Sequence, residues 1–246
     1  MTLNAAQWAC AVVAAIMIGI AKTAISGLSV LNVALLAYVF PSSKQATGFI
    51  LPMLIFADCF AVYSYRRHTQ WPFLWKLFPW TGLGVVLGYV ALGRISDRTT
   101  RELIGAITLA LVALTYWRRS RTPSEDSAPV HWSLAIFVGI VAGFVTLVAN
   151  AAGPLMAIYL VSMRLPKMQY VGTAAVFFLL INLFKVPFMA QLGLVTRDSF
   201  TFNLLLLPAV FLGAAAGRWA LPRINQVLFE RVVLALSAAA GVLLLT

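Results

Sequence analysis

Long apolar runs separated by short polar breaks dominate the sequence. A helix that crosses the hydrocarbon core of a bilayer needs about 20 apolar residues, and eight of ten runs approach that length. The pattern predicts an all-α integral membrane protein with about 8–10 transmembrane segments. The ten runs are residues 5–21, 27–40, 45–64, 73–92, 99–117, 132–149, 153–163, 169–190, 200–220 and 227–245.

Two of these runs are too short for an ordinary membrane crossing. Residues 27–40 and 153–163 comprise 14 and 11 residues, and at about 1.5 Å per residue each covers roughly half to two-thirds of the core. We therefore predict short or discontinuous helices in both places. The sequence leaves open whether they span the membrane or are re-entrant.

Composition and charge fit the same class of protein. Hydrophobic residues make up 62% of the 246-residue chain and charged residues 10%, whereas a soluble domain carries about 25% charged residues. The net charge of +11 comes from cations in the breaks between apolar runs, which is typical of loops that flank membrane helices. The predicted surroundings are therefore a lipid bilayer, and nucleic acid is not an expected partner.

The two halves of the chain share a sequence pattern. A Pro-x4-Gly-x3-Gly motif followed by Leu-x-Arg-Ile occurs twice, and further pairs lie upstream at offsets of 125 and 126. We predict a first membrane repeat at 1–117, a polar linker at 118–131 and a second repeat at 132–246. The pairs at an offset of 129 are Pro79, Gly84, Gly88, Leu92, Arg94 and Ile95 with Pro208, Gly213, Gly217, Leu221, Arg223 and Ile224; the upstream pairs are Pro41 with Pro166 and Gly27 with Gly153.

Each half contains five runs, with the short run second. An odd number of crossings gives the halves opposite orientations, and such inverted repeats are common among secondary transporters. This arrangement places eleven cations on one side and five on the other, so the richer side should be cytoplasmic and both termini external. A four-plus-four arrangement with parallel halves is the alternative.

Polar residues within apolar spans are functional candidates, because burying them in lipid is expensive. One group precedes each short run, where a helix start offers free N–H groups and a positive dipole end to an anion. The predicted substrate-binding residues are Lys22, Thr23, Ser26, Gly27, Asn150, Gly153 and Pro154. The competing interpretation is that Lys22 reaches to a membrane surface and that the glycines serve helix packing.

A second set of polar residues lies deeper in the runs. Asp58, Asn182 and Lys185 are predicted to line the path or to couple proton movement. Asp58 could instead be the structural partner of a buried cation, and Lys185 could reach a membrane surface. Asn182 lies close to the position that matches Asp58, and a direct pair between Asp58 and Lys185 is left open.

Signatures of enzymes and cofactors are missing from the sequence. It contains no His-Glu-x-x-His helix, no Walker loop and no Gly-x-Ser-x-Gly elbow. Cys10 and Cys59 lie inside apolar runs without metal-ligand spacing. We therefore expect no enzyme activity, no cofactor and no metal site. The segment 65–68 (Tyr-Arg-Arg-His) is interpreted as a cytoplasmic loop.

Several segments resemble the sulfite exporter TauE/SafE family of bacterial membrane permeases over nearly the whole chain. They are residues 19–27 (GIAKTAISG), 48–54 (GFILPML), Asp58 with 65–68, and the repeated Pro/Gly block. Ala24 stands where one branch of the family has Gly, and only Gly153 represents a Gly-rich run in the second half. The resemblance implies a multi-pass permease of the bacterial inner membrane that moves small anions, often sulfite or organosulfonates and often outward.

The sequence thus predicts a secondary transporter for a small anionic substrate. A passive anion channel shares every polar feature and is the first alternative. A non-transporting assembly factor or an intramembrane enzyme is the second. A homo-oligomer is compatible with the sequence.

Overall fold

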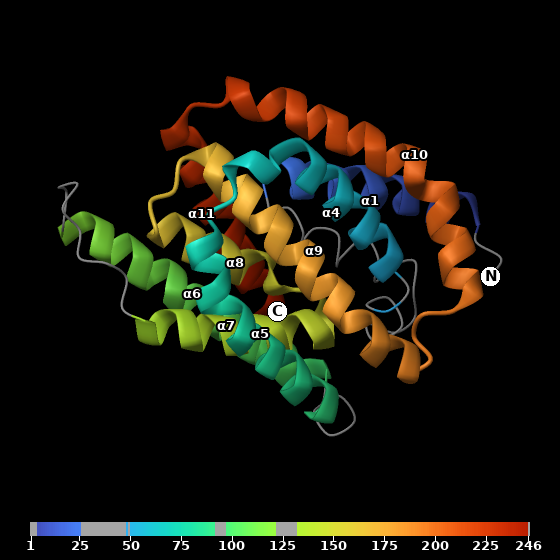
Figure 1. The fold of residues 1–246 in the computed structure, drawn as a ribbon, viewed down its shortest axis with the longest axis horizontal. Helices are drawn as coiled ribbons and strands as arrows, with labels where there is room; N and C mark the ends of the chain where they lie inside the picture. The colour runs from blue at the N-terminus through green and yellow to red at the C-terminus, as the bar shows by residue number, and fades with distance from the viewer. Residues whose placement is uncertain (1–3, 26–47, 49, 92–96, 122–131, 246) are drawn as a thin grey trace.

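A computed structural model describes residues 4–25, 48, 50–91, 97–121 and 132–245. All regular structure in these residues is helical, which confirms the predicted all-α class (Figure 1). The predicted short helix at 27–40, with Ser26 and Gly27, lies outside the described residues. The elements are α1 (Ala5–Thr23), α4 (Leu51–Tyr65), η2 (Arg66–His68), α5 (Trp71–Ala91), α6 (Asp97–Arg121), α7 (Trp132–Ala149), α8 (Ala152–Ser162), α9 (Lys167–Gln191), α10 (Arg197–Ala220), η3 (Leu221–Arg223) and α11 (Gln226–Leu245).

Helix ends follow local sequence signals. Asn4 caps α1, because its side-chain oxygen accepts from the Gln7 N–H at 2.8 Å while the Gln7 side chain accepts from the Asn4 N–H at 3.1 Å. Thr196 and Ser199 form the same reciprocal cap at the start of α10. Helix α7 occupies the predicted run at 132–149, and α8 has only 11 residues. The second predicted short helix is therefore confirmed.

Two predicted crossings differ from the observed helices. The run at 45–64 was expected to be one span, but α4 has 15 residues and begins at Leu51, with Pro52 in its first turn. Proline favours the first turn because it lacks the N–H that helix interiors need. Helix α6 has 25 residues but a low mean hydropathy, with charged residues at both ends. It continues to Arg121 and so includes the first part of the predicted linker.

Six helices of the described chain are long and apolar enough to cross a membrane. This is fewer than the eight full-length runs of the sequence, because α4 is short and α6 is more polar. The described residues nevertheless form a multi-pass membrane protein. The six are α1, α5, α7, α9, α10 with η3, and α11.

The helices pack in pairs, and each pair joins a helix from the first half of the chain to a helix from the second half. Helices α4 and α9 lie side by side near the centre, α1 packs along α10, α5 packs along α7, and α6 packs against α11 (Figure 1). If α1, α4, α5 and α6 correspond to α7, α9, α10 and α11, the α1–α10 and α5–α7 pairs are two copies of one contact. The other two pairs join a helix to its own counterpart.

Close contacts at glycines show that the α1–α10 and α5–α7 pairs match at individual residues. A Cβ on Gly19 of α1 would lie 2.2 Å from the Val210 carbonyl oxygen of α10, and one on Gly143 of α7 would lie 2.0 Å from the Thr81 carbonyl oxygen of α5. Positions 19 and 143 differ by 124, and positions 81 and 210 by 129. The same close backbone approach therefore occurs twice, with equivalent residues.

The reciprocal glycines of each pair behave in the same way. A Cβ on Gly84 of α5 would meet the Ile140 carbonyl oxygen at 2.1 Å, and one on Gly213 of α10 would meet the Ile16 carbonyl oxygen at 2.0 Å. Gly84 and Gly213 belong to the motif that the sequence repeats at an offset of 129. Small residues at membrane helix contacts allow backbones to approach closely.

Counterpart helices run in opposite directions where they meet. The end of α4 lies beside the start of α9, since the Thr69 hydroxyl donates to the Gly172 carbonyl at 3.2 Å and the Gln70 N–H donates to the Thr173 hydroxyl at 3.0 Å. Near the start of α6, Gly105 contacts Gly241 near the end of α11. These contacts support the predicted inverted repeat.

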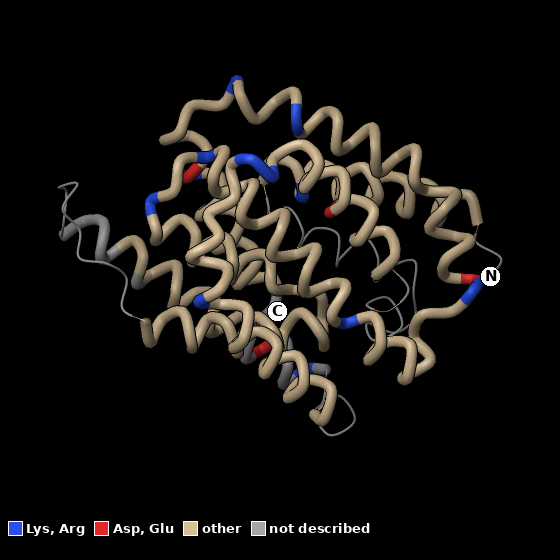
Figure 2. Tube along the Cα trace, in the orientation of Figure 1, with Lys and Arg blue, Asp and Glu red and all other residues tan. Residues whose placement is uncertain are grey.

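Cations gather at one end of the helical bundle (Figure 2). The Arg218 guanidinium donates to the Ser64 hydroxyl at 3.4 Å, and the Lys167 amino group donates to the Pro222 carbonyl at 3.0 Å. These contacts bring the end of α4, the start of α9 and the end of α10 together. The sequence predicts this end to be cytoplasmic. Its basic residues include Arg66, Arg67, Arg164, Lys167, Arg218 and Arg223.

Candidate functional site

A buried ion pair joins the end of α1 to the middle of α4. The Lys22 amino group lies 2.8 Å from Asp58 Oδ1. The Asp58 side chain is completely buried, and the Lys22 side chain is 11% exposed. Lys22 lies in the last turn of α1, where the negative end of the helix dipole favours a cation. Asp58 is therefore the partner of a buried cation, and that cation is Lys22 rather than Lys185.

Asn182 of α9 holds the second oxygen of the Asp58 carboxylate. Its side-chain N–H donates to Asp58 Oδ2 at 2.6 Å. Positions 58 and 182 differ by 124, the same interval that relates Gly19 to Gly143. Equivalent residues of the two halves thus meet between α4 and α9.

Lys185 lies one helical turn further along α9 and is completely buried. Its amino group donates to the Thr146 carbonyl at 3.0 Å, to the Thr146 hydroxyl at 3.1 Å and to the Asn150 side-chain oxygen at 2.6 Å. An ammonium group has three hydrogens, so these acceptors match its full donor capacity. Lys185 points into the protein and not to a membrane surface.

Asn150 owes its position to the break between α7 and α8. Its backbone is left-handed, with φ of 50°, a conformation that asparagine tolerates better than most residues. Its N–H still donates to the Thr146 carbonyl at 3.2 Å, and α8 begins at Ala152. The break therefore ends α7, starts the short α8 and directs the Asn150 side-chain oxygen to Lys185.

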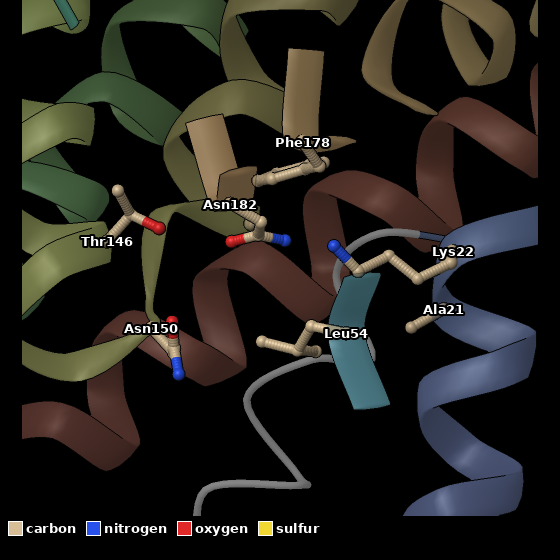
Figure 3. Close-up of a pocket in the computed structure, with 8 residues that line it drawn as sticks. Ala21, Lys22, Leu54, Thr146, Asn150, Phe178 and Asn182 are labelled. Atoms are coloured by element: carbon tan, nitrogen blue, oxygen red, sulfur yellow. The ribbon is translucent and has the colours of Figure 1, made fainter. Parts of the chain in front are cut away.

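A cavity of about 40 Å³ lies between Lys22 and the α7–α8 break (Figure 3). A buried water needs roughly 10–15 Å³ on the same measure, so the cavity has room for a compact group of about three water-sized parts. Four polar residues from three helices and one break share its wall with four small or apolar ones. The polar residues are Lys22, Thr146, Asn150 and Asn182, and the others are Ala21, Leu54, Gly153 and Phe178.

Phe178 packs against the cation at the cavity wall. The Lys22 amino group lies 4.2 Å from the centre of the Phe178 ring, which is cation–π distance. Asp58 and the ring account for two directions around the ammonium. In Figure 3 the side chains of Lys22 and Asn182 extend toward one another from α1 and α9. The remaining donor capacity of Lys22 can serve a ligand in the cavity.

Not every predicted binding residue lines this cavity. The Thr23 hydroxyl donates to the Gly19 carbonyl at 2.9 Å and lies against Gly217, so Thr23 belongs to the α1–α10 contact. Pro154 is buried in the first turn of α8, next to the lining residue Gly153. Asp58 and Lys185 lie behind the wall and hold Lys22 and Asn150, which form it.

Four lining residues were missed in the sequence: Ala21, Leu54, Thr146 and Phe178. Thr146 and Phe178 lie in continuous apolar runs, where neither residue type stands out. Thr146 carries one recoverable signal, because it follows Lys22 by 124 positions, the interval that also separates Gly19 from Gly143. No comparable signal marks Phe178.

We expect replacement of Asn182 by leucine to destabilise the protein. The change removes the only amide donor to Asp58 Oδ2 seen in the described residues, and a hydrogen bond to a charged group contributes about 1.5–3 kcal/mol. Thermal unfolding in detergent should show a lower midpoint for Asn182→Leu than for the wild type. Replacing both partners, as Asn182→Leu with Asp58→Leu, tests the cause. If Asn182→Leu lowers the unfolding midpoint no more than a surface substitution does, the hydrogen bond does not stabilise the protein.

Metal-binding clusters are not found in the described part of the chain, where no group of three His, Cys, Asp or Glu side chains could hold an ion. The polar groups at the cavity are two cations, one carboxylate, two amides and a hydroxyl. Such a set can bind an anion through N–H and O–H donors.

Comparisons with known proteins identify a family. A model of the family described as "Sulfite exporter TauE/SafE" matches residues 11–244, nearly the whole chain. Curated proteins gave no match, and neither did solved structures.

Proposed function

Because the chain belongs to the sulfite exporter TauE/SafE family, we propose that it is a secondary transporter that moves small anions through the cavity beside Lys22. The family consists of membrane permeases, and six helices of the described residues have the length and apolarity of membrane spans. These helices thus agree with the family. The binding residues are our proposal.

One observation carries this proposal: a cation at the wall of a cavity among membrane-spanning helices. Lys22 is held by Asp58 and Phe178 and still borders open space. Burying a charged side chain within a membrane protein is expensive and is a mark of function. A structural lysine would have no need of a cavity beside its amino group.

The remaining wall supplies further donors for an anion. Thr146 accepts from Lys185 through its hydroxyl oxygen, so its own hydrogen is free to donate. Asn182 uses one amide hydrogen on Asp58 and has a second. Gly153 lies in the first turn of α8, where backbone N–H groups lack intrahelical acceptors and the helix dipole is positive. These groups would complete the coordination that Lys22 begins.

The paired helices suggest how access could alternate. The α1–α10 and α5–α7 pairs lie on either side of the α4–α9 pair (Figure 1). In inverted-repeat transporters one unit rocks against another around a site near the midplane. The substrate path would run past Asp58, Asn182 and Lys185 between α4 and α9. Alternatively, these residues would couple proton movement to transport. The predicted location is the bacterial inner membrane, with sulfite or organosulfonates as candidate substrates.

Flux measurements with sulfite test this function. Purified protein in proteoliposomes should move sulfite with a rate that saturates with concentration, because each cycle handles one bound anion. Turnover should be low and should respond to a proton gradient. A large single-channel conductance in planar bilayers would instead show the passive channel. Absence of flux for sulfite, sulfonates and carboxylates alike would exclude a transporter of small anions.

A further inference from the structure

The charges around the cavity do not balance. Among the described residues, Lys22 borders the cavity, while Asp58 and Lys185 lie directly behind its wall. These are two cations and one carboxylate. The remaining lining residues that the structure describes are uncharged. The wall therefore carries one positive charge in excess.

The contacts of all three groups fit their ionised forms. Lys185 has three oxygens within hydrogen-bond distance, as many as an ammonium group has hydrogens. Asp58 Oδ1 forms an ion pair with Lys22, and Asp58 Oδ2 accepts a hydrogen bond from Asn182. Lys185 has only uncharged acceptors in these bonds. Its charge is the one that no carboxylate compensates.

An uncompensated charge away from water is unfavourable, and a ligand of opposite charge relieves it. A ligand with one negative charge would bring the total to zero. A ligand with two would leave a surplus negative charge next to the buried carboxylate of Asp58. Interactions between charges at this depth are weakly screened by salt.

We infer that this cavity selects small oxyanions with a single negative charge over divalent anions of the same shape, and that Asp58 sets the selection. The inference rests on the proposed function and narrows its substrate class. Asp58 does not line the cavity, so it acts through charge and through its hold on Lys22. It is a specificity-determining residue and not a binding residue.

The mixture of apolar and polar residues that line the cavity also suits a monovalent ligand. Leu54 and Phe178 contribute apolar surface, while Asn150 and Asn182 contribute amides. A monovalent oxyanion such as methanesulfonate or acetate has one charged end and one apolar end. A divalent anion such as sulfate has oxygen on every side, so some of its oxygens would face carbon without a donor.

Methanesulfonate and sulfate form a matched pair of probes. Both are tetrahedral around sulfur and have the same number of non-hydrogen atoms, but they carry one and two negative charges. Isothermal titration of the purified full-length protein should show tighter binding of methanesulfonate, by on the order of 100-fold. Equal affinity, or tighter binding of sulfate, would overturn the inference.

Asp58→Asn should abolish this preference. The change keeps the side-chain shape and removes one negative charge, so sulfate should gain affinity relative to methanesulfonate by on the order of 100-fold. Asp198→Asn is the control, because it makes the same change at an exposed residue in the first turn of α10, and its ratio should equal that of the wild type. An unchanged ratio in Asp58→Asn would contradict the role of Asp58.

A second variant tests the charge count if Asp58→Asn does not assemble. Lys185→Gln removes the uncompensated cation at a residue that does not itself line the cavity and keeps a donor for Asn150. Its affinity for methanesulfonate should fall at least about tenfold. Unchanged affinity would overturn the inference. If the wild-type protein binds none of these anions, the proposed function itself fails, and that outcome differs from binding without discrimination.

Discussion

Replacing Lys22 with methionine is expected to reduce anion flux at least about 100-fold, because the substituted side chain keeps its length and loses its charge. Lys22 is the only cation in the described lining of the cavity. The wild type and the variant should be compared in proteoliposomes at equal reconstituted protein. Flux near the wild-type level in Lys22→Met would defeat the proposed site.

The loss must be separated from unfolding. Lys22→Met leaves the buried Asp58 without its ion-pair partner, and breaking a buried pair on one side costs about 3–5 kcal/mol. The double variant Lys22→Met with Asp58→Asn removes both charges and should regain thermal stability. Flux should stay low in the double variant, because the contact to the anion is still missing. Recovery of flux together with stability would show that Lys22 serves structure alone.

Alanine at Gly143 is expected to destabilise the packing of α7 on α5. The added Cβ would lie 2.0 Å from the Thr81 carbonyl oxygen, so two helix backbones would have to separate. Overpacking costs typically about 1–3 kcal/mol, and an obstacle made of backbone places this change at the upper end. Gly19→Ala should behave in the same way at the α1–α10 contact, where the Cβ would lie 2.2 Å from the Val210 carbonyl oxygen.

Gly82→Ala in α5 provides the matched control. A Cβ at Gly82 would approach nothing closer than 3.9 Å, and alanine favours the helix over glycine by about 1 kcal/mol. Thermal unfolding in detergent should therefore show Gly82→Ala at or above the wild-type midpoint and both Gly143→Ala and Gly19→Ala well below it. Equal midpoints for all three variants would mean that these close approaches do not stabilise the fold.

The pattern of apolar runs predicts much of the fold because the bilayer requires long apolar helices. Helix α7 and the short α8 lie almost where the sequence places them. The expected span at 45–64 differs from the 15-residue α4, since hydropathy alone does not show that this helix begins at Leu51 with Pro52 in its first turn. Apolar character continues through such a break, and only local backbone geometry reveals it.

The site is predictable in part. The sequence marks polar residues within apolar runs, but it does not show which of them meet between helices. Lys22, Asp58, Asn182 and Lys185 stand out because polar side chains in apolar runs are costly. Spacing along a helix does not tell which of two lysines reaches a carboxylate on another helix, so the pairing of Asp58 with Lys22 needed the structure. Phe178 could not be singled out, because its role depends on a cation from α1.

The repeat offers a route to residues that composition hides. The motif offset of 129 applies to α5 and α10, while α1 and α7 align at an offset of 124. With the second offset, Thr146 is the counterpart of Lys22, and Asn182 is the counterpart of Asp58. Positions related by this offset therefore both contribute to the site, with side chains of different charge.

An experimental structure with selenite tests the central claim most directly, because selenium can be located by anomalous scattering. We expect selenium density in the cavity, within hydrogen-bond distance of the Lys22 amino group and near the side chains of Asn150 and Asn182. Density at another place, or a cavity that contains only water at a selenite concentration that saturates transport, would contradict the account.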